Sequence, residues 1–370
     1  MDDSVKRRRR IAIAALGGLA VGAFAFGVAL GDGTPAEESA ASKLPASQLA
    51  GQRIVVGYPG AKPPPAVKAM VREGRIAGVI LFAENFPSRA AGRRAAAGLQ
   101  ALRRPPGLRD PLLVMVDQEG GLVKRLDGAP TASARQMGAR GAAFSREQGV
   151  RTAANLRGVG INVDLAPVLD VARPGSDTAE TERGFGTDPA RVAATAIPFA
   201  DGLQEGGVAA TAKHFPGLGS ARMNTDFSVQ RIGLPKATLR GVDEAPFAAF
   251  AEADGAMVMV SSAIYPALSP RPAAFAPEIA TGELRQRIGF EGVSITDALG
   301  SVAVADFGGP AKAGVAAARA GMDVLLFTDF RAGARAGAAL LAGLRSGKLR
   351  RADLETSAGR VLRLRHSLGA

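Results

Sequence analysis

The chain has 370 residues, of which 47% are hydrophobic and 22% charged, a balance typical of a globular protein with a sizeable core. It has no cysteine, which excludes disulfides, thiolate metal ligands and thiol nucleophiles. The formal net charge is +12, but there is no tryptophan and there are only two tyrosines. Only the charge therefore supports a nucleic-acid-binding function, because few aromatic side chains are present on which bases could stack. The excess charge fits either an arginine-rich composition or attraction to an anionic wall polymer or membrane surface.

Residues 1–32 carry the pattern of a signal segment. Five basic residues, 6–10, directly precede the uncharged run "IAIAALGGLAVGAFAFGVAL" at 11–30. Twenty helical residues span about 30 Å, the thickness of the hydrocarbon core, whereas a cleaved signal has an apolar core of about 7–15 residues. The pattern favours an uncleaved membrane anchor at 11–30, with cleavage near "AFA" at 23–25 as the alternative. Basic residues stay on the cytoplasmic side, so the rest of the chain is expected outside the cytoplasm, membrane-anchored or secreted.

Residues 33–49, "GTPAEESAASKLPASQL", are small, polar and proline-containing, which predicts a flexible tether. Residues 50–370 are expected to form one domain. Helical alanine- and arginine-rich stretches alternate there with eight short aliphatic or β-branched runs, at 53–58, 78–83, 112–117, 161–167, 208–215, 257–262, 293–298 and 322–327.

Eight buried strands, each followed by a helix over about 300 residues, predict an α/β fold of the (β/α)8 barrel type. An open doubly wound sheet is the alternative. The sequence does not support a nucleotide-binding protein of that fold, because neither G-x-G-x-x-G after the first strand nor a P-loop lysine motif is present.

Polar residues stand at the carboxyl ends of five predicted strands. In a barrel, reactive residues come from these strand ends and the loops that follow them. One such residue is often only a helix cap or a buried, hydrogen-bonded carboxylate, but five at the same rim predict a functional pocket. The strand-end residues are Asp117, Asp164, Lys213 with His214, Ser262 and Asp297.

Six ordered motifs between about residues 50 and 345 resemble glycoside hydrolase family 3, in its β-N-acetylhexosaminidase branch. The resemblance implies a barrel that hydrolyses β-glycosides with retention, through a covalent glycosyl-enzyme intermediate on a carboxylate. The motifs are "DQEGGLVKRL" (117–126), "NVDLAPVLDV" (162–171), "RGFGTDP" (183–189), "KHFPGLG" (213–219), "YPALS" (265–269) and "GFEGVSITDALGS" (289–301).

The resemblance also implies a role for individual residues. Asp297, in "SITDAL", matches the nucleophile. Asp117 is expected to accept hydrogen bonds from sugar hydroxyls, since a carboxylate binds two neighbouring hydroxyls at once. The remaining residues expected in the same sugar-binding subsite are Arg125, Arg183, Lys213 and His214.

One catalytic residue of that family pattern is missing. The resemblance implies a proton-carrying histidine two residues after an aspartate in the loop that follows the fifth strand. Asp226 matches the aspartate, but Ser228 stands in place of the histidine, and the loop is about two residues longer. Two further positions depart from the pattern that the resemblance implies: Ser262 stands in place of a histidine, and Gly184 in place of a serine. Asp226 is therefore the first candidate for the general acid, and Glu182 the second.

The second histidine of the chain, His366, lies in the basic C-terminal stretch "RVLRLRHSLGA" and is expected on a solvated helix face. Two distant histidines without cysteine do not make a zinc site, and no EF-hand spacing occurs. No metal and no cofactor are therefore expected.

The sequence predicts an extracytoplasmic retaining β-glycosidase, a β-N-acetylhexosaminidase acting on cell-wall-derived or related β-glycosides. The alternative hypothesis is a membrane-tethered carbohydrate-binding protein that has lost catalysis together with the histidine. The expected partners are a carbohydrate and, through residues 11–30, a membrane, but no nucleic acid.

Overall fold

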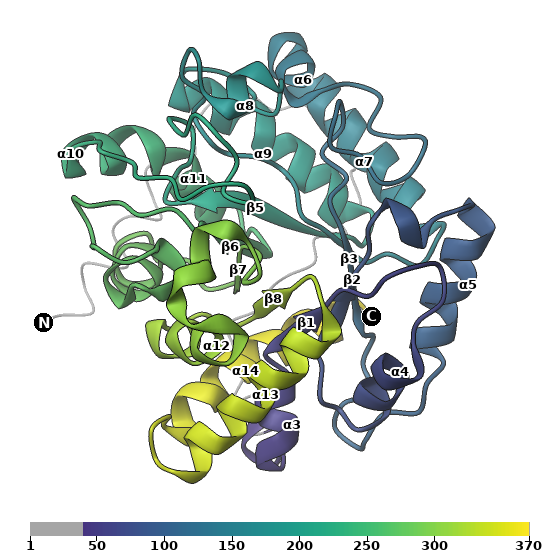
Figure 1. Ribbon diagram of the computed structural model, residues 1–370. Helices are drawn as coiled ribbons and strands as arrows, with labels where there is room; N and C mark the ends of the chain where they lie inside the picture. The colour runs from purple at the N-terminus through teal and green to yellow at the C-terminus, as the bar shows by residue number, and fades with distance from the viewer. Residues whose placement is uncertain (1–39, 370) are drawn as a thin grey trace, which may run out of the picture.

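Eight short parallel strands form the centre of the computed structural model, which describes residues 40–369 (Figure 1). Strands β1 to β7 pair in chain order, and β8 pairs with β1. A parallel bridge between Ile295 and Val324 joins β7 to β8, so that the sheet closes on itself. The eight predicted strands and the (β/α)8 architecture are confirmed. The strands are β1 (Ile54–Val56), β2 (Gly78–Ile80), β3 (Leu113–Val116), β4 (Val163–Asp164), β5 (Ala209–Phe215), β6 (Met257–Val260), β7 (Val293–Thr296) and β8 (Leu325–Phe327).

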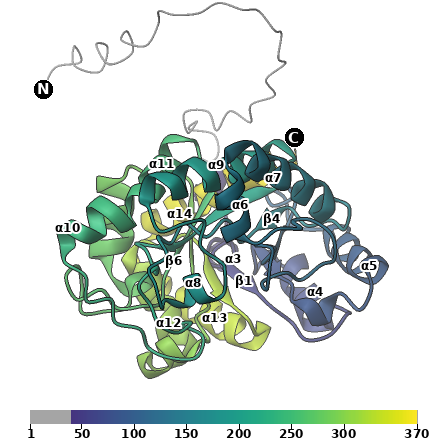
Figure 2. The ribbon, with the colours of Figure 1, turned by 90° about the horizontal axis from the view of Figure 1, so that it is seen from above.

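Helices surround the strands, as the view turned by 90° also shows (Figure 2). The α-helices are α3 (Ala46–Gly51), α4 (Pro65–Arg72), α5 (Arg89–Gln100), α6 (Ala134–Arg140), α7 (Ala142–Arg157), α8 (Asp177–Glu180), α9 (Pro189–Glu205), α10 (Lys236–Thr238), α11 (Ala245–Glu252), α12 (Gly309–Ala320), α13 (Phe330–Arg345) and α14 (Arg351–Ser367). Shorter or wider helical turns are η2 (Ala83–Asn85), η3 (Leu239–Asp243), η4 (Ala273–Phe275), η5 (Glu278–Arg287) and η6 (Val302–Phe307).

Successive strand residues contribute to two separate hydrophobic layers. Val55, Met115 and Ile295 belong to the cluster inside the barrel. Their neighbours Val56 and Val116 belong to the larger cluster between the strands and the helices. Because both faces of each strand are buried, β1, β2, β3, β6 and β8 are continuous apolar runs instead of alternating ones.

Helix α14 closes the amino-terminal end of the barrel. Its Val361 and Leu364 belong to the cluster inside the barrel. Next to them, the buried guanidinium of Arg365 donates a hydrogen bond to the side chain of Gln52, just before β1. It also donates to three backbone carbonyls that precede β3, those of Leu108, Asp110 and Pro111. The pocket-forming loops therefore lie at the other end.

The segment predicted as a tether, residues 33–49, differs from the structure in the part that is described. Ala41, Leu44 and Leu49 are buried, and Arg351 of α14 donates a hydrogen bond to the carbonyl of Leu44 at 2.9 Å. Helix α3 contacts α13 and α14. The packed part thus begins before the boundary expected at residue 50, because the few apolar side chains among the small polar ones find a place against these helices.

Within residues 40–369, no helix is long and apolar enough to cross a membrane. The predicted signal or anchor segment, residues 1–32 with its apolar run at 11–30, lies outside the described residues.

We expect Arg365→Leu to lower the free energy of unfolding by about 2–4 kcal/mol, because buried carbonyls lose a charged donor. Urea unfolding measures the loss. Arg363→Leu is the matched control: Arg363 lies half-buried on the same helix and makes no side-chain hydrogen bond within residues 40–369. Equal losses in the two variants would contradict the role of Arg365.

Candidate active site

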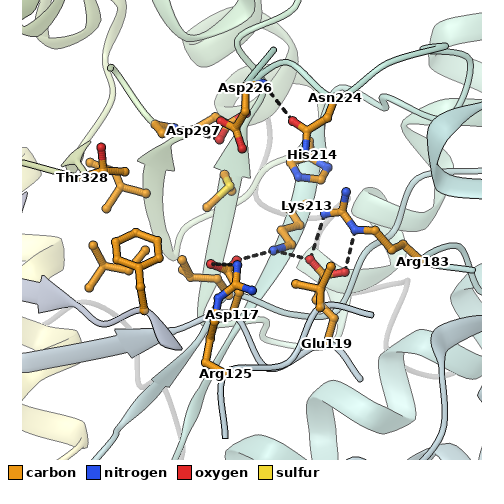
Figure 3. A pocket seen from close by; sticks show the side chains of 17 residues that line it. Asp117, Glu119, Arg125, Arg183, Lys213, His214, Asn224, Asp226, Asp297 and Thr328 are labelled. Carbon is orange, nitrogen blue, oxygen red and sulfur yellow. Dashed lines mark hydrogen bonds and ion pairs between the residues drawn. The ribbon is translucent and has the colours of Figure 1, made fainter. Parts of the chain in front are cut away.

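A pocket opens at the carboxyl ends of the strands, with about 670 Å³ of empty space when its open mouth is included (Figure 3). Its base is apolar and continues the inside of the barrel, through Ile80, Phe82, Leu165, Met259 and Leu326. Its polar lining consists of Asp117, Glu119, Arg125, Arg183, Lys213, His214, Asn224, Asp226, Asp297 and Thr328.

Charged side chains form one side of this pocket. The Lys213 ammonium lies 2.7 Å from Asp117 Oδ1 and 2.7 Å from Glu119 Oε1. Arg183 donates two hydrogen bonds to Glu119, at 2.8 and 2.9 Å, and Arg125 lies 3.7 Å from Asp117. The side chains of Lys213 and Glu119 are only 2% and 3% exposed. Charges so far from water need these partners, and the pairs hold one another in place.

The neighbours of each buried charge keep it ionised. Burial raises the pKa of Glu119, but the positive charges of Arg183 and Lys213 outweigh burial and bring that pKa well below its ordinary value. Burial lowers the pKa of Lys213, but Asp117 and Glu119 raise it above its ordinary value. The cluster therefore presents fixed donors and acceptors to the pocket at neutral pH, as the recognition of sugar hydroxyls requires.

His214 is oriented by a buried carboxylate behind it. Its Nδ1 lies 2.8 Å from Asp170 Oδ2, and Asp170 Oδ1 accepts hydrogen bonds from the backbone N–H groups of His214 and Leu218, at 3.1 and 2.6 Å. A carboxylate partner at Nδ1 makes that nitrogen the donor and leaves Nε2 for the pocket.

Asp297 follows β7 directly and lies across the pocket from Asp117 and Glu119 (Figure 3). Its Oδ1 accepts a hydrogen bond from the N–H of Ala298 at 2.7 Å, and its Oδ2 accepts one from the Thr225 hydroxyl at 3.1 Å. Both oxygens are therefore held in a fixed orientation at the end of a rigid strand.

Asp226 lies next to Asp297, on the loop that follows β5 (Figure 3). Its N–H donates to Asn224 Oδ1 at 2.8 Å, and its carbonyl accepts from the N–H of Val302 at 3.3 Å. The residue is exposed at the mouth, but nearby atoms shield its carboxyl group, and this burial, followed by the negative charge of Asp297, raises its pKa. A carboxyl group with a raised pKa stays protonated over more of the pH range, which a general acid requires.

The residues predicted from the sequence as catalytic or substrate-binding lie together in this pocket, although their roles stay predictions. They are Asp117, Arg125, Arg183, Lys213, His214, Asp226 and Asp297. Glu182, the second candidate acid, is not in the lining. Its carboxylate bonds to the Ser133 hydroxyl at 2.9 Å and to Arg135 at 2.5 Å, which directs it elsewhere.

The other residues singled out from the sequence do not line the pocket. Asp164 is fully buried; its Oδ1 accepts a hydrogen bond from the N–H of Gln118 at 2.9 Å, and burial raises its pKa well above the ordinary value. The buried Ser262 hydroxyl has no hydrogen-bond partner within residues 40–369. At Gly184, a Cβ atom would lie 2.7 Å from the Cβ of Ala172, so a serine there needs a shift of the backbone. His366 is exposed on α14, as expected.

Besides Thr328, four polar residues of the site were not predicted from the sequence. Glu119 and Asp170 stand inside the motifs quoted above. The signal for Asp170 was an acidic residue within an otherwise apolar stretch, which needs a buried partner. Asn224 and Thr225 lie in a loop without periodicity, where nothing in the sequence indicates which side chains turn inward.

Comparison with known proteins places the chain in a family. The family model described as "Glycosyl hydrolase family 3 N terminal domain" matches residues 47–364. The chain belongs to glycoside hydrolase family 3. It is a glycoside hydrolase, and the predicted family and enzyme class are confirmed.

Relatives in this family cover most of the chain. An uncharacterized secreted glycosyl hydrolase of Arthroderma benhamiae is 36% identical over 331 residues, 87% of this chain and 93% of the relative. A beta-hexosaminidase of Alkalilimnicola ehrlichii is 33% identical over 285 residues, 75% and 80% of the two chains. The solved structure of a glycoside hydrolase family 3 beta-N-acetylglucosaminidase from Paenibacillus sp. superposes with a TM-score of 0.84 at 31% identity. That match covers 88% of this chain but only 64% of the Paenibacillus protein.

Glu119→Gln should lower the free energy of unfolding at pH 7 by about 3–5 kcal/mol, because it leaves the buried charges of Lys213 and Arg183 without a partner. The folded-state pKa of Glu119 lies below its ordinary value of 4.5. Its contribution to stability is therefore complete above that pH and is lost as the pH falls towards the folded-state pKa. The difference between variant and parent should shrink in urea unfolding below about pH 4.5. The exposed Glu84→Gln is the control, and a difference independent of pH would contradict the interpretation.

Proposed function

We propose that this chain is a retaining β-N-acetylhexosaminidase in which Asp297 is the nucleophile and Asp226 the general acid and base. The observation that carries the proposal is the position of the Asp297 carboxylate. It directly follows β7, across the pocket from a fixed polar cluster and beside a second carboxyl group whose pKa is raised. A retaining glycosidase needs one carboxylate at the anomeric carbon and one carboxyl group that holds a proton for the leaving oxygen.

The polar cluster supports a role in holding the sugar. Asp117 keeps 16% of its side chain exposed to the pocket and can accept hydrogen bonds from two neighbouring hydroxyls. Lys213, Arg183 and the free Nε2 of His214 supply positive charge and a further polar contact around the same ring. The relatives described as hexosaminidases support an N-acetylhexosamine as that sugar.

The proposed reaction proceeds in two displacements. An oxygen of Asp297 bonds to the anomeric carbon while the bond to the leaving oxygen breaks, and that oxygen takes the proton of Asp226. Asp226, now a carboxylate, then removes a proton from water. The water oxygen bonds to the anomeric carbon, the ester bond to Asp297 breaks, and both carboxyl groups return to their starting forms.

We also infer that the enzyme acts outside the cytoplasm, on β-glycosides derived from the cell wall or related to it. The basic cluster at 6–10 followed by the apolar run at 11–30 supports this location. The A. benhamiae relative, described as secreted, is consistent with it.

A carbohydrate-binding protein without turnover is the second candidate function, because the resemblance implies a proton-carrying histidine at the position that Ser228 occupies. The two functions differ in one measurement. A panel of aryl β-glycosides is hydrolysed by the enzyme, whereas the binding protein gives saturable binding of N-acetylglucosamine in calorimetry without hydrolysis.

Asp297→Asn should reduce kcat on an aryl β-N-acetylglucosaminide by about 10³-fold or more, because an amide keeps the shape but cannot form the glycosyl ester. Sugar affinity should change little, and calorimetry checks it. Asp110→Asn, at the opposite end of the barrel, is the control. A parental rate in Asp297→Asn would refute the proposal that Asp297 is the nucleophile.

Asp226→Asn should slow substrates with poor leaving groups by about 10²–10⁴-fold and activated phenyl glycosides far less, since only the former need a proton. Steady-state rates across phenols of graded acidity provide the measurement. The same small effect on every leaving group would remove Asp226 from the role of acid.

A further inference from the structure

The residue before the proposed acid also reaches the site. Thr225 is 2% exposed, and its hydroxyl donates to Asp297 Oδ2 at 3.1 Å. Within residues 40–369, no other side chain donates a hydrogen bond to this carboxylate. The proposed nucleophile on β7 and the loop after β5 are therefore joined directly, through a side chain adjacent to Asp226.

The backbone of this loop is docked on the segment that follows β7. The carbonyl of Thr225 accepts a hydrogen bond from the N–H of Ala303, and the carbonyl of Asp226 accepts one from the N–H of Val302, both at 3.3 Å. Asn224 turns back to bind the N–H of Asp226. Long backbone bonds allow the loop some movement, whereas a hydrogen bond to a charged group is stronger and directional.

The histidine that the resemblance implies as proton carrier is Ser228 in this chain, so the proposed acid Asp226 depends more strongly on the position of the loop. An imidazole reaches farther from the backbone than a carboxyl group does, so an aspartate that replaces it needs the backbone closer to the substrate. Proton transfer requires the acid within about 2.6–3.2 Å of the leaving oxygen, and a misplacement of 1 Å costs about 10²-fold in rate.

We propose that Thr225 is a positioning residue: its hydroxyl orients Asp297 and, through the adjoining backbone, holds Asp226 at the separation from Asp297 that the reaction needs. This inference rests on the function proposed above. It joins the nucleophile and the acid through one hydrogen bond, so that a displaced loop disturbs both.

The charges around Asp226 give this proposal a distinctive readout. Asp297 and Asp117 raise the pKa of Asp226, His214 and Arg183 lower it, and burial raises it most. A loop that moves outward loses burial and the nearby charge of Asp297, so the pKa of Asp226 falls. Activity that depends on protonated Asp226 is lost as the pH rises through this pKa, and the alkaline limb of the kcat profile therefore moves to lower pH.

The test compares Thr225→Val with the parent and with Thr225→Ser. The valine variant keeps the shape and removes the hydroxyl. It should lose about 10- to 100-fold in kcat on a glycoside with a poor leaving group and less on an activated phenyl glycoside, with its alkaline limb at lower pH. The serine variant should restore most of the rate and the pH profile. Thr211→Val is the matched control, because the buried Thr211 hydroxyl of β5 has no hydrogen-bond partner among the described residues.

The outcomes separate this inference from the proposed function. A parent chain without turnover on any glycoside refutes the function, whatever Thr225 does. An active parent with an unchanged valine variant, or a serine variant as slow as the valine one, overturns the positioning role. An equal loss on all leaving groups with an unchanged pH profile also overturns it. Thermal unfolding checks the fold of each variant, and Thr225→Ala replaces the valine variant if that one does not fold.

Discussion

The ammonium group of Lys213, removed from water at the end of β5, is the constraint on which the rest of the site depends. A buried charge without partners costs several kcal/mol, so Asp117 and Glu119 must lie beside it, and Glu119 in turn pairs with Arg183. These residues come from β5, from the turn after β3 and from the segment after α8. The cluster is therefore complete only when the barrel is closed, and its polar groups are already oriented before a ligand arrives.

The opposite side of the pocket follows a different design. Asp297 is fixed at a strand end by a backbone N–H, whereas Asp226 depends on a loop that meets the barrel at a few hydrogen bonds. A rigid wall of paired charges thus faces a wall of which one half, the loop that carries Asp226, can adjust. This division suits a site that must admit a ring, enclose it and release it, because the adjustable half moves without disturbing the buried ion pairs.

Much of the fold followed from the sequence, because strands buried on both faces give unbroken apolar runs, and parallel strands bring their polar ends to one rim. The site residues that the sequence did not predict were missed for physical reasons. Glu119 and Asp170 are buried acids whose partners, Arg183 and His214, are distant in the sequence, and only the closed barrel brings them together. The predicted boundary at residue 50 relied on composition, which does not reveal that a few leucines among small residues find a surface to cover.

The first described residues and the pocket lie at opposite ends of the barrel. Leu44 is bound by Arg351, the first residue of α14, and α14 covers the amino-terminal end of the barrel. The chain therefore enters the domain on the side opposite the pocket mouth. The first described residues therefore do not cover the mouth of the pocket. A ligand can thus enter the pocket from the solution without passing the segment through which the chain joins the barrel.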